Sequence, residues 1–253
     1  MGDVEITTPR GVRLAGTYEP GPGATAVLFA HGFLADRHAD LRFDILASAY
    51  RTAGHATLQL DFSGCGASED DVVTAAHQVE DLRSASAWLA EQGHSRQAVH
   101  AHSFGTLAAL RAHAPAVTTM VLTAPLTGPL TYPWEQIFSA EQLDDLEHHG
   151  LTRVPDDNDG ERQHSVISRE TLGDYSLIDQ VELLGAVRVP VLLVHDSSSP
   201  RDNDLLEMSR EGLDLLPEGS RVEVLGGAGY GSLGHVDEVA ELTLAWLAEH
   251  LPH

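Results

Sequence analysis

The chain of 253 residues contains no lysine and a single cysteine, Cys65. One cysteine cannot form a disulfide within the chain, which is compatible with a reducing compartment. The apolar runs are short: TAVLFA and VPVLLVH fall far below the roughly 20 residues that a membrane-spanning helix needs. The first residues, MGDVEITTPRGVRL, lack the basic and then apolar pattern of a signal peptide. We therefore expect a cytoplasmic protein that does not enter a membrane.

Basic charge is also scarce, because 15 arginines face 38 acidic residues and give a formal net charge of −23. Such a surface repels nucleic acid and anionic membranes, so we expect neither as a partner. The 15 histidines are scattered, with no H-E-x-x-H or C-x-x-C spacing. We expect no metal, no cofactor and a small-molecule substrate. The sequence does not indicate an oligomeric state.

Short apolar runs alternate with helix-periodic segments along the whole chain. VEITT and VRLAGTYEP predict two opening strands that pair antiparallel. The later runs TAVLFAH, ATLQLDF, QAVHAHS, TTMVLTAP, VPVLLVH and RVEVLGG predict further strands, most of them without polar alternation. Strands of this kind are buried on both sides. The pattern therefore predicts an α/β fold with a mostly parallel sheet and helices on both faces.

One segment interrupts this alternation. Residues 126–189, between VLTAP and VPVLLVH, are far more than a crossover connection needs. SAEQLDDLEHHG and SRETLGDYSLIDQVELLG within it are typical of helices. We expect a helical cap over the carboxyl edge of the sheet, with residues 1–125 and 190–253 forming the core.

Ser103 lies in the stretch AHSFG, between a predicted strand and a predicted helix. A catalytic serine on such a turn has the pattern G-x-S-x-G, because the turn is tight and needs small neighbours. Ala101 stands where the first glycine is usual. The turn also presents the Phe104 N–H at a helix N-terminus, where it can stabilise an oxyanion. A second loop, HGFL, is expected to supply another such N–H from Phe33 or Leu34.

With these motifs, together with DFSGCGAS, VPVLLVH and GGAGY, the chain resembles the α/β-hydrolase superfamily over essentially its full length. Within that superfamily it looks most like small bacterial esterases of the cinnamoyl and feruloyl kind. The resemblance implies an α/β-hydrolase fold with a cap. It also implies a Ser–His–Asp mechanism in which Ser103 takes up the acyl group.

Two positions depart from the family pattern. Where the resemblance places the acid, this chain has Ser199, and where it places the histidine, this chain has Tyr230. A serine carries no charge to stabilise an imidazolium. A tyrosine, with a pKa near 10, is a poor general base at neutral pH. The triad is therefore non-standard or degenerate.

Two interpretations remain. In the first, the protein is an ester hydrolase in which His235 replaces the missing base and Asp196 or Asp202 replaces the missing acid. In the second, Ser103, Tyr230 and the oxyanion N–H groups perform a non-hydrolytic reaction of the cyclase, lyase or isomerase type, or the site only binds a small ligand. We expect an enzyme resembling an ester hydrolase and acting on a small acyl or carbonyl substrate.

Aromatic residues of the insertion bear on the substrate. The candidates for substrate contact are Tyr132, Trp134, Phe138 and Tyr175. They favour an aromatic or moderately hydrophobic small molecule. The alternative is that these side chains hold the cap against the core.

Overall fold

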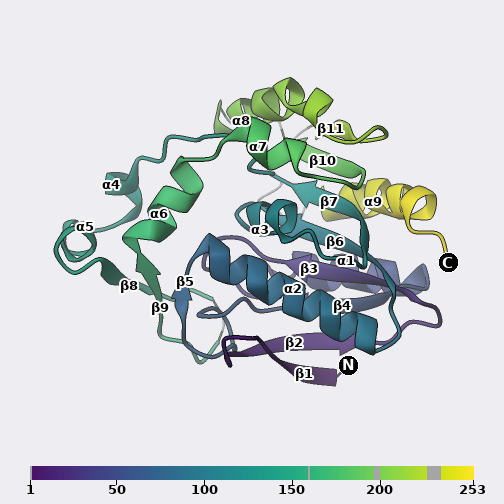
Figure 1. The fold of residues 1–253 in the computed structure, drawn as a ribbon, viewed down its shortest axis with the longest axis horizontal. Helices are drawn as coiled ribbons and strands as arrows, with labels where there is room; N and C mark the ends of the chain where they lie inside the picture. The colour runs from purple at the N-terminus through teal and green to yellow at the C-terminus, as the bar shows by residue number, and fades with distance from the viewer. Residues whose placement is uncertain (1, 159, 197–199, 227–234) are drawn as a thin grey trace.

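The computed structural model of the protein describes residues 2–158, 160–196, 200–226 and 235–253. Within these ranges strands and helices alternate, and helices pack on both faces of a central sheet (Figure 1). This arrangement confirms the predicted α/β class with a mostly parallel sheet.

The central sheet has eight strands among the described residues, in the order β1-β2-β4-β3-β6-β7-β10-β11. They are β1 (Gly2–Thr7), β2 (Arg13–Glu19), β3 (Thr25–Ala30), β4 (Ala56–Leu60), β6 (Arg96–His102), β7 (Val117–Thr123), β10 (Val191–Asp196) and β11 (Arg221–Leu225). β2 pairs antiparallel with both β1 and β4, and the remaining pairs are parallel. All six residues of β3 are buried, which explains why its sequence shows no polar alternation.

The helices form two layers. The elements are α1 (Arg42–Thr52), α2 (Ala75–Glu91), α3 (Gly105–Ala112), α7 (Gln180–Gly185), α8 (Pro200–Glu211), the 3₁₀ turn η1 (Leu213–Leu215) and α9 (Val236–His250). Buried side chains of α2, α3, α7 and α8 share one apolar cluster with the sheet, and those of α1 and α9 share a second cluster. The sheet therefore separates α1 and α9 from the other helices.

Most of residues 126–189 form a structure that projects at one end of the molecule, on the left in Figure 1. The projecting part contains α4 (Trp134–Ile137), α5 (Ala140–His148), β8 (Leu151–Pro155), β9 (His164–Ser168) and α6 (Arg169–Ser176), whereas the last helix of this range, α7, packs against the core. β8 and β9 form an antiparallel hairpin, and β9 also pairs with the two-residue strand β5 (Val72–Val73). We expected a cap made of helices alone, but the insertion also contains the strands β8 and β9, in which buried and more exposed residues alternate. Together with β5 of the core they form a small three-stranded sheet.

The segment after β10 begins a helix. Asp202, one of the two aspartates considered as a replacement for the missing acid, lies in the first turn of α8, which begins at Pro200. Proline favours the first helical position, because its fixed φ suits a helix and its missing N–H would have no partner there. α8 contributes Leu205 to the apolar cluster on the α3 side of the sheet.

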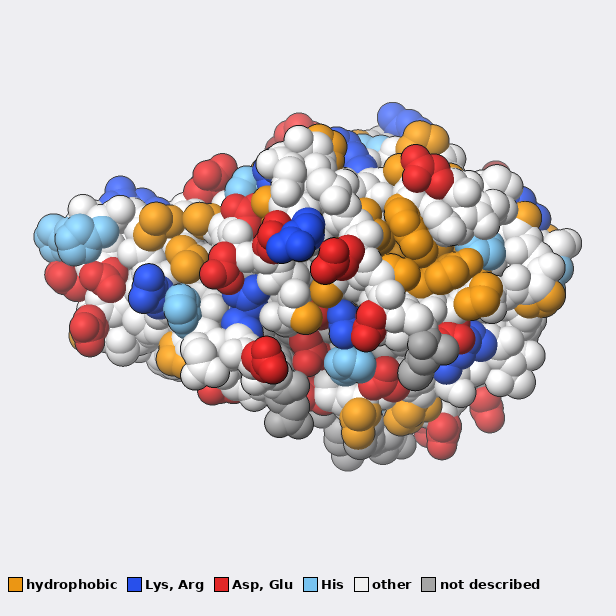
Figure 2. Space-filling model, turned by 90° about the horizontal axis from the view of Figure 1, so that it is seen from below, with side chains coloured by type: hydrophobic (Ala, Val, Ile, Leu, Met, Phe, Trp, Pro, Cys, Tyr) orange, Lys and Arg blue, Asp and Glu red, His pale blue; other side chains and the backbone are white. Residues whose placement is uncertain are grey.

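Acidic side chains are dispersed over the surface. Figure 2 shows them scattered across one face of the molecule rather than gathered in one cluster. This distribution accompanies the formal net charge of −23. Among the described helices, none is both long and apolar enough to cross a membrane.

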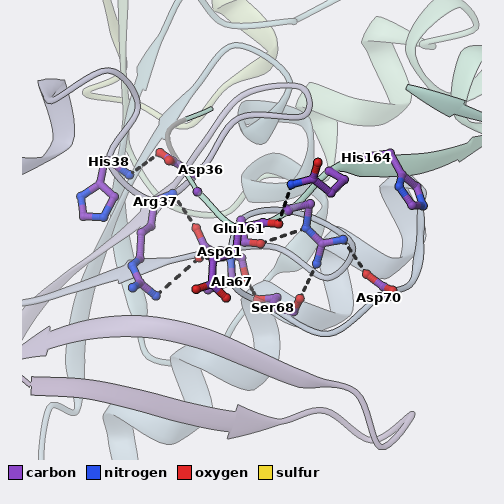
Figure 3. Close-up of a pocket in the computed structure, with 13 residues that line it drawn as sticks. Asp36, Arg37, His38, Asp61, Ala67, Ser68, Asp70, Glu161 and His164 are labelled. Atoms are coloured by element: carbon purple, nitrogen blue, oxygen red, sulfur yellow. Dashed lines mark hydrogen bonds and ion pairs between the residues drawn. The ribbon is translucent and has the colours of Figure 1, made fainter. Parts of the chain in front are cut away.

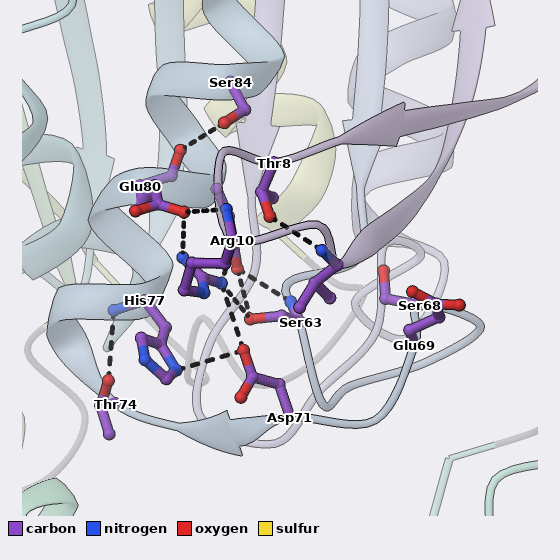
Figure 4. Close-up of polar contacts among 12 residues, drawn as sticks. Thr8, Arg10, Ser63, Ser68, Glu69, Asp71, Thr74, His77, Glu80 and Ser84 are labelled. Atoms are coloured by element: carbon purple, nitrogen blue, oxygen red, sulfur yellow. Dashed lines mark hydrogen bonds and ion pairs between the residues drawn. The ribbon is translucent and has the colours of Figure 1, made fainter.

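Arg10 ties the hairpin of β1 and β2 to α2 (Figure 4). Its guanidinium donates to Glu80 at 2.6 Å, to the buried Asp81 at 2.8 Å and to Asp71 at 3.2 Å. Burial raises the pKa of the Asp81 carboxyl, and hydrogen bonds from Ser63 and Arg10 oppose that rise. Removal of Arg10 would leave a buried carboxylate without its cation.

We predict that Arg10→Ala lowers the free energy of unfolding by about 3 kcal/mol, because an unpaired carboxylate at Asp81 is costly to bury. Arg13→Ala is the matched control, since Arg13 also pairs with a carboxylate, Glu69, but on the surface. Urea unfolding curves of both variants and the parent measure the difference. Equal losses for the two variants would contradict the role assigned to Arg10.

Candidate active site

Ser103 lies on the turn between β6 and α3 and is half-buried. Its φ is +51°, a left-handed conformation that costs a residue with a side chain about 1 kcal/mol or more. The turn is held from both sides: the Ser103 N–H donates to the Thr123 carbonyl at 2.9 Å, and the Thr106 hydroxyl donates to the Ser103 carbonyl at 2.5 Å. These bonds keep the strained serine at the carboxyl edge of the sheet.

Gly105 brings α3 close to the end of β3. A β-carbon on Gly105 would lie 2.3 Å from the carbonyl oxygen of His31 and 2.6 Å from that of Ala30, so only glycine fits. The other glycine of the usual pattern is replaced by Ala101, which is fully buried in the core cluster on the α3 side. Of the two glycine positions in the pattern, only the second, Gly105, strictly requires glycine.

The loop after β3 is positioned by His31. Its Nδ1–H donates to the Gly32 carbonyl at 2.8 Å, while its Nε2 accepts the Phe62 N–H at 3.0 Å. These partners fix a neutral tautomer, and burial of the ring lowers the pKa of His31. The loop passes directly beside the serine, since a β-carbon on Gly32 would lie 3.5 Å from the Ser103 β-carbon.

The three backbone N–H groups expected to bind an oxyanion are those of Phe33, Leu34 and Phe104. Leu34 is left-handed, with φ of +51°, and Phe104 precedes the first residue of α3. Within the described parts of the chain, no hydrogen bond engages any of these three N–H groups. Uncommitted donors next to a strained serine are what acyl transfer requires.

The aromatic residues of the insertion pack against this loop. The Phe104 ring lies 4.2 Å from the Tyr175 ring and 5.5 Å from the Tyr132 ring, measured between centroids. Tyr175 is completely buried, and its hydroxyl donates to Gln78 of α2 at 3.0 Å. Its contacts are those of a side chain that joins the insertion to the core.

Trp134 and Phe138 extend the same aromatic row. Trp134 stacks on Tyr132 at 4.7 Å and lies 5.7 Å from Phe138. Phe138 is buried in the apolar core of the insertion, whereas Trp134 is half-exposed. Of the four aromatic residues expected to contact substrate, Trp134 is therefore the most accessible.

Only some of the candidate bases and acids lie within the described residues. Ser199 and Tyr230 lie outside the described residues. His235 precedes α9, and its Nδ1 lies 3.1 Å from Glu238 Oε2. No contact among the described residues joins His235 to Ser103. Glu238 was not among the expected acids, although residues three positions apart lie on the same face of a helix and can pair.

Asp196 and Asp202 belong to different elements, β10 and α8. Val194 of β10 belongs to the same apolar cluster as Val236 of α9, and Asp196 lies two residues further along the strand. Because side chains alternate along a strand, Asp196 points to the α9 side, where it is buried. Asp202 belongs to α8, which packs on the opposite side.

A cavity of about 620 Å³ lies beside the oxyanion loop, between residues 36–38, the loop after β4 and residues 160–164 (Figure 3). Asp61 accepts the backbone N–H groups of Arg37 at 2.6 Å and Ala67 at 2.9 Å, and its Oδ2 lies 3.4 Å from the Arg37 guanidinium. Arg162 of the insertion donates to the Gly66 carbonyl at 2.9 Å and to Asp70 at 2.6 Å. Ser103 does not line this cavity. The cavity therefore lies between the core and the insertion and is separate from the serine.

No group of three or more His, Cys, Asp or Glu side chains in the described ranges is arranged to hold a metal ion. Of the histidines near Ser103, His100 is buried and His102 is half-buried. Burial lowers the pKa of His102 to about 3, and its Nδ1 lies 3.1 Å from the Thr123 hydroxyl. Burial also lowers the pKa of His100 to about 3, and the Tyr50 hydroxyl bonds its ring.

Comparison with known families decides the classification. A sequence model of the alpha/beta hydrolase family matches residues 27–242. The chain belongs to the α/β hydrolase family. No curated protein matches the chain.

Solved structures share the α/β hydrolase fold. DcsB, in complex with its substrate analogue, is 17% identical, with a TM-score of 0.80 and coverage of 99% of both chains. The α/β hydrolase GrgF from Penicillium sp. sh18 is 20% identical, with a TM-score of 0.79 and coverage of 100% of this chain and 99% of its own. The esterase domain of a Rhodothermus marinus protein is 20% identical, with a TM-score of 0.70 and coverage of 98% of both chains. At these identities the similarity establishes the fold.

We predict that Gly105→Ala destabilises the protein by about 1 to 3 kcal/mol, because the added methyl group collides with backbone carbonyls at the end of β3. Gly173→Ala is the matched control: Gly173 lies in α6 and a β-carbon there would meet no atom within 4 Å. The control should be stabilised by roughly 0.5 to 1 kcal/mol, since alanine is the better helix former. Urea unfolding measures both, and an unchanged Gly105→Ala variant would contradict the tight approach of α3.

Proposed function

We propose that the protein hydrolyses esters of small molecules and that Ser103 is the nucleophile. The observation that carries the proposal is the turn at Ser103, which is left-handed and lies next to N–H groups without a described acceptor. Neighbours of the same fold include the esterase domain from Rhodothermus marinus and an esterase from Pyrococcus furiosus. Their names agree with ester hydrolysis.

In the proposed reaction the Ser103 oxygen attacks the carbonyl carbon of the ester, and a base accepts the hydroxyl proton. The carbonyl oxygen becomes an oxyanion and receives hydrogen bonds from the Phe104 N–H and from the Phe33 or Leu34 N–H. The intermediate collapses, the alcohol leaves with the proton, and an acyl-serine remains. Water then attacks the acyl-serine by the same steps and releases the acid.

We assign the base to His235. A carboxylate at Nδ1, here Glu238 at 3.1 Å, holds the proton on that nitrogen and leaves Nε2 as an acceptor. Asp196 is the second candidate for the acid, since it points to the side of the sheet on which α9 packs. Asp202, in the first turn of α8, is the third candidate.

The substrate proposed is an uncharged or cationic ester with an aromatic or moderately hydrophobic acyl group, such as a cinnamoyl or feruloyl ester. Trp134 is half-exposed at the end of the aromatic row that begins at Phe104, so a flat apolar group has a surface to contact. The net charge of −23 disfavours anionic substrates.

The test is hydrolysis of p-nitrophenyl acetate, p-nitrophenyl butyrate and methyl ferulate by the purified protein. We predict that Ser103→Ala lowers kcat/KM by at least about a thousandfold, because no acyl-enzyme can form. Ser48→Ala, at an exposed position of α1, is the matched control and keeps the activity of the parent. Hydrolysis that survives Ser103→Ala would refute the nucleophile assignment.

The base assignment is tested in the same assay. His235→Ala should reduce kcat about as far as Ser103→Ala does, since members of a triad act as a unit. His148→Ala is the matched control, because His148 forms a similar pair with Asp144 on the surface of α5. Activity retained in His235→Ala but lost in Ser103→Ala would show that another group is the base.

A further inference from the structure

A side chain of the insertion bonds the backbone of the oxyanion loop. The Asn158 amide Nδ2 donates to the carbonyl oxygen of Leu34 at 2.9 Å, although the two residues are 124 positions apart in the chain. Asn158 lies in the loop between β8 and β9, and Leu34 follows β3. The bond therefore connects the insertion to the loop whose N–H groups are assigned to the oxyanion.

The orientation of the Asn158 amide is fixed by Asp156. Asp156 Oδ1 accepts the Asn158 backbone N–H at 2.8 Å and also the Asn158 Nδ2–H at 2.7 Å. If the amide were turned over, its oxygen would face two acceptors, Asp156 Oδ1 and the Leu34 carbonyl. The Asp156 N–H in turn donates to the Gln163 carbonyl at 3.1 Å, which anchors the arrangement to the β8–β9 hairpin.

The left-handed conformation of Leu34 is stabilised by a hydrogen bond from outside its own loop. Its φ of +51° is unfavourable for a branched side chain. The described hydrogen bond within this turn, from the Ala35 N–H to the Gly32 carbonyl, is long at 3.4 Å. The shorter bond from Asn158 fixes the plane of the peptide that follows Leu34 and thereby opposes rotation of the loop.

The Leu34 side chain and its neighbour are held by the same insertion. Leu34 packs against the apolar cluster that contains Phe138 and Leu146. The Phe33 ring lies 5.8 Å from the Tyr175 ring, in an edge-to-face arrangement. Side-chain packing and the Asn158 bond therefore act on two successive residues of one loop.

We propose that Asn158 is a positioning residue, which holds the peptide between Leu34 and Ala35 so that the preceding N–H groups of the loop, those of Phe33 and Leu34, face the substrate oxyanion formed at Ser103. The inference rests on the proposed ester hydrolysis. It assigns to the insertion a part in catalysis that differs from covering the substrate. Because the oxyanion forms only in the transition state, loss of this bond should lower kcat and leave KM nearly unchanged.

The experiment uses two substitutions in the full chain. Asn158→Asp keeps the shape of the side chain but replaces the donor with an acceptor that faces the Leu34 carbonyl and Asp156. Asn158→Ala removes the side chain without adding charge. Asn203→Asp, at an exposed position of α8, adds the same charge as Asn158→Asp and is the matched control.

Four quantities are measured for each variant. They are kcat and KM for p-nitrophenyl butyrate, the concentration of reactive Ser103 from fluorophosphonate titration, and the inhibition constant of an aryl trifluoromethyl ketone. The hemiketal oxygen of this ketone occupies the oxyanion position. Normalisation to titrated sites removes the effect of any unfolded fraction.

We expect both Asn158 variants to lose at least about tenfold in kcat, since removal of a whole oxyanion donor costs about 10²–10³-fold and here a donor is displaced. KM should change by less than about twofold, and the affinity for the ketone should fall by a factor similar to that in kcat. Asn203→Asp should match the parent. A role of Asn158 in folding alone would lower the titrated fraction but leave kcat per site and ketone affinity intact.

Two results overturn the inference in distinguishable ways. An active parent with Asn158→Ala and Asn158→Asp within about twofold of its kcat overturns the positioning role and leaves the proposed function standing. A parent that neither hydrolyses the ester nor reacts with fluorophosphonate at Ser103 overturns the proposed function, and the positioning role with it.

Discussion

The close approach of Gly105 to the carbonyl oxygens of Ala30 and His31 is the constraint on which the site depends. No β-carbon fits between the first turn of α3 and the end of β3. This contact brings the serine turn and the loop after β3 to the same point at the edge of the sheet. The strain at Ser103 is sustained because hydrogen bonds from neighbouring segments fix the turn from both sides.

The insertion takes part in this arrangement through polar as well as apolar contacts. Its hairpin completes a small sheet with β5, Arg162 bonds the loop after β4, and Asn158 bonds the loop after β3. Tyr175 and Phe104 pack edge to face across the boundary. The insertion, residues 126–189, is thus separate from the core, residues 1–125 and 190–253, only in the order of the chain. In the folded protein the two parts pack against each other.

The features that could be predicted from the sequence are those set by residues close together in the chain. Unbroken apolar runs such as TAVLFA indicate strands covered on both faces, and the sheet has these strands. The position of Ser103 between strand and helix also followed from the local pattern. β8 and β9 were missed because they are short and partly exposed, and because β9 finds its partner in β5, far earlier in the chain.

Long-range contacts explain what the sequence could not predict at the site. Nothing in PDDNDGE indicates that Asn158 reaches the backbone of Leu34. Asp202 lies in a helix that was not predicted, although Pro200, two positions earlier, favours the helix start found there. The side of the sheet to which Asp196 points became clear only once α9 had been placed. The assignment of base and acid therefore depends on tertiary structure, whereas the nucleophile turn does not.

The most direct test of the central claim is a crystal structure of the protein after reaction with a small alkyl fluorophosphonate. The account predicts phosphorus bonded to Ser103 Oγ. It also predicts one phosphoryl oxygen at about 2.7 to 3.1 Å from the Phe104 nitrogen and from the nitrogen of Phe33 or Leu34. An adduct on another residue, or a phosphoryl oxygen directed away from these N–H groups, would contradict the account.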